Sequence, residues 1–190
     1  MCSCKQGEIS AMQNTYTQLI RKEDLNTDVC VSMMISMYFG IEMQSALQWS
    51  NEHRYTELIK AQVMIEQGKS EMLITKLYSG TPIGMIIYTE ADDQPVRRID
   101  ALIVGRRFRG NGIGKMLLRA AKGGRDLHTF APAVAVDWYI KNGFRELERQ
   151  ANGTIEMTTA TEHKELTLSY PLPVFDQLDL QILRNVKHMH

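Results

Sequence analysis

The sequence predicts an α/β fold with a mixed, mostly antiparallel central sheet of about six to seven strands and helices on both faces. Short apolar runs between residues 71 and 104 are separated by turn residues such as Gly80 and Pro82, which is typical of an antiparallel meander. Helical spacing at 113–122 then lies between the strand-like segments 96–104 and 127–131, so a strand–helix–strand crossover is expected there. With 44% hydrophobic residues, the chain is also apolar enough to bury a core.

Each element is placed by its apolar spacing and by the residues that end it. The expected strands are 15–21, 71–78, 83–90, 96–104, 127–131, 144–149 and 165–170, with a polar, Thr-rich connection between the last two. The expected helices are 28–39, 42–67 with a break near residues 50–52, 113–122, 133–142 and 174–186. The chain is therefore divided into a flexible leader (1–14), one domain (15–172) and a C-terminal helical extension (173–190).

Charge and cysteine content restrict the classes of protein to consider. The 22 basic and 22 acidic residues cancel, which argues against a dedicated nucleic-acid binder. No apolar run approaches the ~18 residues that span a membrane, and the first residues do not resemble a secretory signal. Three cysteines, two of them in the first four residues, do not make a disulfide framework. We therefore expect a cytoplasmic protein without a metal site.

A basic, glycine-rich segment follows the strand expected at 96–104 and opens the helix expected at 113–122. The first turn of a helix has N–H groups without intrahelical partners and a partial positive charge, so it favours anions. Glycines at Gly110, Gly112 and Gly114 allow a phosphate to approach the backbone. Arg109 and Lys115 add positive charge, and this pattern predicts a phosphate-binding loop.

Two common phosphate loops do not fit this segment. The P-loop pattern GxxxxGK(S/T) requires Ser or Thr after Gly114-Lys115, where Met116 stands, and a glycine where Arg109 stands. The dinucleotide pattern GxGxxG begins well at Gly110 but requires a third glycine where Lys115 stands.

The segment instead resembles the GNAT superfamily of N-acetyltransferases. The family pattern (Gln/Arg)-x-x-Gly-x-(Gly/Ala) is met by Arg109, Gly112 and Gly114. Leu102 and Val104 match the Leu-x-Val that usually precedes it, and an aromatic residue stands directly before the arginine.

A second GNAT signature, Ala-x-x-x-Tyr-x-x-x-Gly-Phe, matches Ala135, Tyr139, Gly143 and Phe144. The two motifs are separated by about the distance usual in the family, and the resemblance covers residues 70–150. One position departs from the family pattern: Pro132 stands where many members carry an asparagine that helps to hold the cofactor.

The resemblance implies that acetyl-CoA is the co-substrate. Backbone N–H groups of the loop would hold its pyrophosphate, and the end of the preceding strand would pair with the pantetheine amides. The cofactor-binding residues that the resemblance implies are Leu102, Ile103, Val104, Phe108, Arg109, Gly110, Asn111, Gly112, Ile113, Gly114 and Lys115.

Tyr139 is the expected general acid, which would protonate the leaving thiolate of coenzyme A; its alternative role is that of a packed aromatic. Asp100, an acid in an otherwise apolar strand, is the first candidate for the general base. An ion pair with Arg97 or Arg98 is an equal interpretation. Trp138 is expected in the core. Weaker candidates for the base are Glu42, His53, Glu90, His128 and water.

The expected function is transfer of an acetyl group from acetyl-CoA to an amine by direct attack in a ternary complex. Two alternatives stay open. One is transfer of another acyl-type group to an unusual acceptor, including nucleic acid or aminoacyl-tRNA. The other is a catalytically inactive module that binds coenzyme A. Residues 28–67 and 173–190 are expected to shape the acceptor pocket or a homodimer contact.

Overall fold

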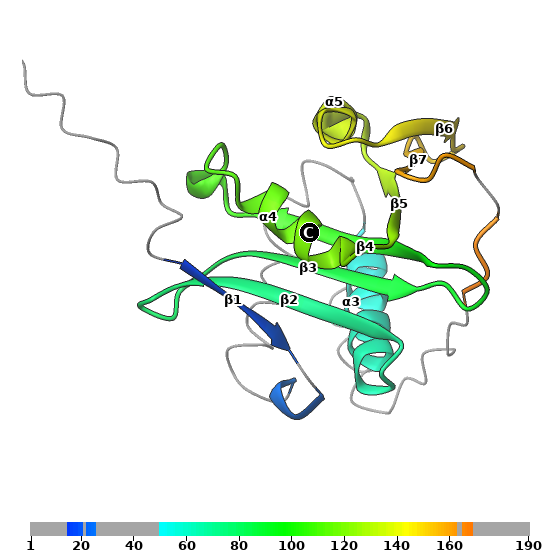
Figure 1. The fold of residues 1–190 in the computed structure, drawn as a ribbon. Coiled ribbons are helices and arrows are strands. Elements are labelled where there is room, and N and C mark those ends of the chain that lie inside the picture. The colour runs from blue at the N-terminus through cyan, green and yellow to red at the C-terminus, as the bar shows by residue number, and fades with distance from the viewer. Residues whose placement is uncertain (1–14, 21, 26–49, 163–164, 169–190) are drawn as a thin grey trace, which may run out of the picture.

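A computed structural model describes residues 15–20, 22–25, 50–162 and 165–168. Within this part of the chain, seven strands form one sheet in the order β1-β2-β3-β4-β5-β7-β6 (Figure 1). The strands are β1 (Thr15–Ile20), β2 (Ser70–Leu77), β3 (Pro82–Glu90), β4 (Val96–Val104), β5 (Asp126–Ala131), β6 (Arg145–Arg149) and β7 (Ile155–Thr158). Every neighbouring pair is antiparallel except β4 and β5, which confirms the predicted mixed sheet.

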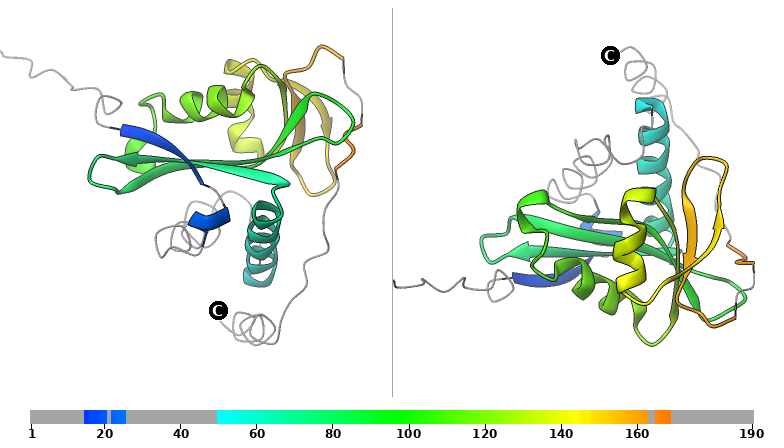
Figure 2. Two further views of the ribbon diagram at one scale, coloured as in Figure 1. Left: turned by 60° about the horizontal axis from the view of Figure 1, so that its bottom comes forward. Right: turned by 90° about the horizontal axis from the view of Figure 1, so that it is seen from above.

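Helices cover both faces of the sheet (Figure 2). Helix α3 packs on one face, and α4 and α5 pack on the other. The helices are α3 (Asn51–Glu66), α4 (Ile113–Lys122) and α5 (Val136–Lys141), with short 3-10 turns η2 (Lys22–Asp24), η3 (Arg106–Phe108) and η4 (Ala133–Ala135). No helix among the described residues is long and apolar enough to cross a membrane.

Helix α4 sits close to the sheet because its apolar stripe meets a glycine on β3. A side chain at Gly84 would lie 3.0 Å from Cγ2 of Ile113 and 3.2 Å from the carbonyl oxygen of Ile103. Ile113 and Leu117 are buried over this point, so the start of α4 is positioned precisely against the end of β4.

Strands β4 and β5 pair only at their first four positions and then diverge. Their last pair joins Ile99 to Thr129, after which β5 continues its pairing with β7 alone. On its other side β4 carries a bulge: β3 pairs Tyr88 with Ile99 and Ile87 with Ala101, so Asp100 is the extra residue. A bulge bends its strand and increases its twist, which contributes to the separation of β4 from β5.

Helix α3 begins within the break predicted near residues 50–52, and residues 42–49 lie outside the described residues. Ser50 caps α3 by accepting a hydrogen bond from the backbone N–H of His53 at 3.1 Å, so the helix begins at Asn51. The helix predicted at 133–142 is shorter and starts as the 3-10 turn η4. The predicted helices 28–39 and 174–186, the leader and the whole C-terminal extension lie outside the described residues.

The prediction of a last strand at 165–170 is wrong for residues 165–168, the part that the structure describes. The final strand is instead β7, inside the connection that looked irregular, and residues 165–168 form no strand. A tight turn explains this: Gln150 N–H bonds to the Thr154 carbonyl at 2.8 Å, and Gly153 takes a φ of +83°. The turn returns the chain so that β7 pairs with β6 and β5 at once.

Candidate active site

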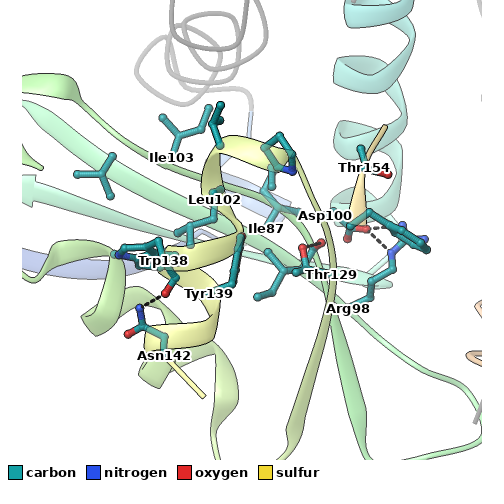
Figure 3. A pocket seen from close by; sticks show the side chains of 18 of the residues that line it. Ile87, Arg98, Asp100, Leu102, Ile103, Thr129, Trp138, Tyr139, Asn142 and Thr154 are labelled. Carbon is teal, nitrogen blue, oxygen red and sulfur yellow. Dashed lines mark hydrogen bonds and ion pairs between the residues drawn. The ribbon is translucent and has the colours of Figure 1, made fainter. Parts of the chain in front are cut away.

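A groove of about 1470 Å³ opens where β4 and β5 diverge. Figure 3 shows Trp138 and Asn142 at one end of the drawn side chains, Arg98 and Asp100 at the other, and Tyr139 between them. Most of the predicted site residues line this groove, namely Asp100, Leu102, Ile103, Val104, Arg109, Gly110, Gly112, Ile113, Gly114, Lys115 and Tyr139.

One part of the groove presents the backbone N–H groups at the start of α4. Gly112 is the N-cap of α4 with a φ of +78°, and Gly110 has a φ of +81°. The first helical hydrogen bond runs from Met116 N–H to the Gly112 carbonyl at 2.9 Å, so the three preceding N–H groups have no intrahelical acceptor. Arg109 Nε donates to the Val104 carbonyl at 3.1 Å and ties the loop to the end of β4.

Two residues of the predicted loop do not line the groove. Phe108 packs against the core on the α4 side of the sheet. Asn111 donates from Nδ2 to the Phe108 carbonyl at 3.3 Å and closes the turn. Both side chains therefore shape the loop, and their contact with a cofactor stays a prediction.

One wall of the groove is the edge of β4 that no strand of the described residues pairs with beyond Ile99. Leu102 and Val104 belong to β4 and pair with β3 on one side, whereas β5 offers no partner beyond Ile99 among the described residues. Strand edges present backbone N–H and C=O groups that hydrogen-bond an extended, amide-bearing ligand. Pantetheine carries two amides, and its binding along this edge remains our prediction.

Tyr139 lines the groove and is hydrogen-bonded to Thr129, the last β5 residue that pairs with β4. Its side chain is only 6% exposed, and its ring contacts those of Trp138 and Phe144 at 5.0 Å between centroids. Burial raises the pKa of Tyr139 to about 12, and a hydrogen bond with Thr129 acts in the opposite direction. Thr129 also bonds to the Ile99 carbonyl at 3.4 Å. The phenol therefore keeps its proton at neutral pH, as a general acid requires.

Asp100 lines the groove and also forms the ion pair with Arg98 that was the alternative interpretation. Its Oδ1 accepts a hydrogen bond from Arg98 Nε at 2.8 Å. Thr89 donates to its other oxygen and is joined to Ser70 at 2.6 Å. Burial raises the pKa of the Asp100 carboxyl, whereas Arg98 and Thr89 lower it. Arg97 pairs instead with Glu90, at 2.7 Å.

The weaker candidates for a base are placed away from the groove. His128 is 2% exposed, and its Nε2 lies 2.8 Å from Oε1 of Glu156. Glu90 and His53 do not line the groove, and Glu42 lies outside the described residues.

The expectation that Trp138 lies in the core is wrong. Its side chain is 36% exposed and lines the groove. A Cβ on Gly114 would lie 2.9 Å from its Cζ2, so α5 rests on the first turn of α4 through the indole. Sequence reasoning did not single out the other groove residues of α5 and of the β6–β7 turn, which are Lys141, Asn142, Gln150, Ala151, Asn152 and Thr154.

A diverging parallel pair of strands lies beside a glycine-rich helix start, an arrangement that suits an extended, anionic cofactor along a strand edge. Residues 38–129 match the model of the Acetyltransferase (GNAT) family, and this match contains the first motif with Arg109, Gly112 and Gly114. The matched stretch of 92 residues, in a chain of 190, identifies an acyltransferase domain of the kind that uses acetyl-CoA as the acyl donor. No curated protein sequence shows significant similarity to the chain.

Solved structures share the fold. An acetyltransferase of the GNAT family from Staphylococcus aureus superposes with a TM-score of 0.59 at 13% identity, covering 76% of this chain and 100% of that one. An acyl-CoA N-acyltransferase from Pseudomonas aeruginosa gives 0.58 at 16% identity, covering 77% and 99%. ElaA from Escherichia coli gives 0.56 at 14% identity, covering 77% and 99%.

Proposed function

We propose that this protein is an acetyl-CoA-dependent N-acetyltransferase that transfers the acetyl group to an amine by direct attack in a ternary complex. The observation that supports the proposal is one continuous groove lined by the start of α4, with its backbone N–H groups, and by a buried, protonated Tyr139 near the point of divergence. The donor would span both, with its pyrophosphate at α4 and its thioester beside Tyr139.

The chemistry follows from this placement. A neutral amine attacks the thioester carbonyl carbon, and a C–N bond forms as the oxyanion develops. A backbone N–H of the β4 edge stabilises that oxyanion. The C–S bond then breaks, and Tyr139 gives its proton to the leaving sulfur. Much of the rate comes from holding amine and thioester in line.

We place the acceptor amine at the α3 end of the groove, where Asp100 would take its proton. Glu57 and Lys60 of α3 line this end together with Arg98. The hydrogen bonds from Arg98 and Thr89 orient the Asp100 carboxylate, and its raised pKa makes it a better base than an exposed carboxylate.

Asp100→Asn is expected to lower kcat/KM about 100-fold, the lower end of the usual contribution of a general base. Because burial raises the Asp100 pKa above its ordinary value of 3.8, the wild-type rate falls as pH drops through that higher value. The variant should lack this fall in rate at low pH. Initial rates of both proteins measured from pH 5 to 9 test the difference. Glu90→Gln is the matched control, because it breaks the Arg97 ion pair outside the groove. If Asp100→Asn shows the same fall in rate at low pH as the wild type, Asp100 has a structural role.

Thr129→Val is expected to lower kcat about three- to tenfold with little change in KM, the contribution of one neutral hydrogen bond. The Thr129 bond lowers the Tyr139 pKa, so its loss makes the phenol a weaker acid. Thr158→Val is the control, because that buried hydroxyl bonds the Leu127 carbonyl outside the groove. Equal losses of kcat in both variants would mean that Thr129 acts only through folding.

The function itself is tested by release of free coenzyme A from acetyl-CoA, with and without panels of small amines, polyamines, peptides and aminoacyl-tRNA. Amine-dependent release with a stoichiometric acetylated amine supports the proposal. Release only from another acyl-CoA would change the donor. Binding of acetyl-CoA without turnover on any acceptor would favour an inactive coenzyme A-binding module.

A further inference from the structure

Two buried hydroxyl groups lie beside Asp100 on the α3 side of the sheet. Ser70 of β2 is 5% exposed and Thr89 of β3 is 3% exposed, and the two residues are paired across β2 and β3. Their neighbours at alternate strand positions, Met72 and Ile87, belong to the apolar core that α3 covers. A buried hydroxyl costs free energy unless it is hydrogen-bonded, and an apolar side chain of similar size avoids that cost. Packing alone therefore does not explain why both side chains are polar.

The direction of the hydrogen bonds between these groups follows from the number of protons. Thr89 has a single O–H and donates it to Oδ2 of Asp100. Oγ of Ser70 lies 2.6 Å from Oγ1 of Thr89. Because the proton of Thr89 is already used, Ser70 must be the donor of this second bond. Ser70 thus donates to Thr89, and Thr89 donates to the carboxylate. Each bond in such a chain polarises the next one and strengthens it.

The two oxygens of the Asp100 carboxylate have different surroundings. Oδ1 accepts two hydrogen bonds from Arg98, one from Nε at 2.8 Å and one from Nη2 (Figure 3). Oδ2 accepts the bond from Thr89. A carboxylate oxygen has about two lone-pair sites, so Oδ1 is saturated by Arg98 whereas Oδ2 retains a site. The Asp100 side chain is 18% exposed and lines the groove, so a ligand in the groove can reach the carboxylate.

We propose that Ser70 and Thr89 are positioning residues that hold Oδ2 of Asp100 as the atom that takes the proton of the acceptor amine. The N–H bond of the attacking amine breaks, its electron pair stays on the nitrogen, and an O–H bond forms at Oδ2. Thr89 keeps donating to this oxygen after the transfer, because a protonated carboxyl retains acceptor capacity. This inference rests on the proposed function and adds two residues to the surroundings of its base.

The groups around this carboxyl determine the sign of the pH effect. Burial raises the pKa of Asp100, Arg98, the Thr89 hydrogen bond and Lys60 of α3 lower it, and Glu57 of α3 raises it. Loss of the Thr89 bond therefore raises the Asp100 pKa further, and the fall in rate at low pH then begins at a higher pH. A side chain that acted only through packing would change stability without moving this midpoint.

Carboxyl ¹³C NMR titrations of the aspartates test the inference, together with the pH dependence of kcat/KM; Asp100→Asn identifies the Asp100 signal. Thr89→Val is expected to move the Asp100 midpoint up by about one pH unit, the effect of losing one hydrogen bond to a charged group. Ser70→Ala should move it in the same direction by roughly a quarter of that, because only the cooperative part is lost. Thr89→Ser keeps the O–H and should titrate as the wild type does. Thr75→Val is the matched control, because this buried hydroxyl pairs with Thr17 at 3.1 Å outside the groove.

Three results would overturn the inference. An unchanged Asp100 midpoint in Thr89→Val would show that Thr89 does not hold Oδ2. An unchanged midpoint in Ser70→Ala would end the chain at Thr89, and this variant, which removes one oxygen atom, keeps the inference testable if Thr89→Val does not fold. An equal shift in Thr75→Val would assign the effect to packing. The NMR titration needs no acceptor, so these results are separate from a failure of the proposed function, which would be the absence of any acetylated amine.

Discussion

Gly112→Val is expected to raise the Kd of acetyl-CoA by more than about 100-fold. Gly112 has a φ of +78° as the N-cap of α4, a conformation that a β-branched residue adopts only with strain. The valine would also place methyl groups over the N–H groups that open the helix. Loss of two hydrogen bonds to a charged phosphate costs about 3–6 kcal/mol, which is a change in Kd of that size or larger. Isothermal calorimetry with coenzyme A measures it.

The control for Gly112→Val is Gly80→Val. Gly80 has a φ of +87° in the β2–β3 turn, and a Cβ there would have no neighbour within 4 Å. Both variants carry a similar backbone strain of about 1–2 kcal/mol, so their thermal unfolding midpoints should fall together. Only Gly112→Val should lose coenzyme A binding. If Gly112→Val binds as the wild type does, the start of α4 is not the pyrophosphate site.

Tyr139→Phe is expected to reduce kcat by about 10²- to 10⁴-fold, the usual contribution of a general acid. The KM for acetyl-CoA should change little, because the phenyl ring preserves the contacts with Trp138 and Phe144. Steady-state kinetics with saturating acceptor measure the effect.

The pH dependence provides a second test of Tyr139. Its pKa is raised to about 12, so the phenol stays protonated from neutral pH to well above pH 10. Wild-type kcat should therefore show no loss from tyrosine ionisation up to pH 10. Tyr78→Phe is the control, because Tyr78 is 72% exposed and does not line the groove. Full activity of Tyr139→Phe over the whole pH range would rule out its role as the acid.

The conformation of the glycine-rich loop was predictable because its parts are contiguous. Gly110, Gly112 and Gly114 determine a local backbone conformation, and that conformation alone creates the N–H cluster at the start of α4. The strands of the meander were predictable for the same reason, since apolar alternation and turn residues act over a few positions.

Strand β7 was missed because its pairing is not local. The segment Ile155–Thr158 has only four residues, and it becomes a strand because β5 and β6 supply hydrogen bonds on both sides. Sequence pattern favoured residues 165–170, where Thr167 instead bonds to Asp93 at 2.9 Å. Tertiary pairing overrides local propensity in such short segments.

By itself, the sequence determined that a glycine-rich, basic loop follows a strand and opens a helix, that Tyr139 follows on the next helix, and that an acid stands in the strand before the loop. Only the tertiary structure decided that these parts line one groove. The bulge at Asp100 and the divergence after Ile99 open the groove, and the missing side chain at Gly114 brings Trp138 to its rim. The physical reason is that loop chemistry depends on neighbours in the chain, whereas a groove depends on which strands fail to pair and which helix faces meet.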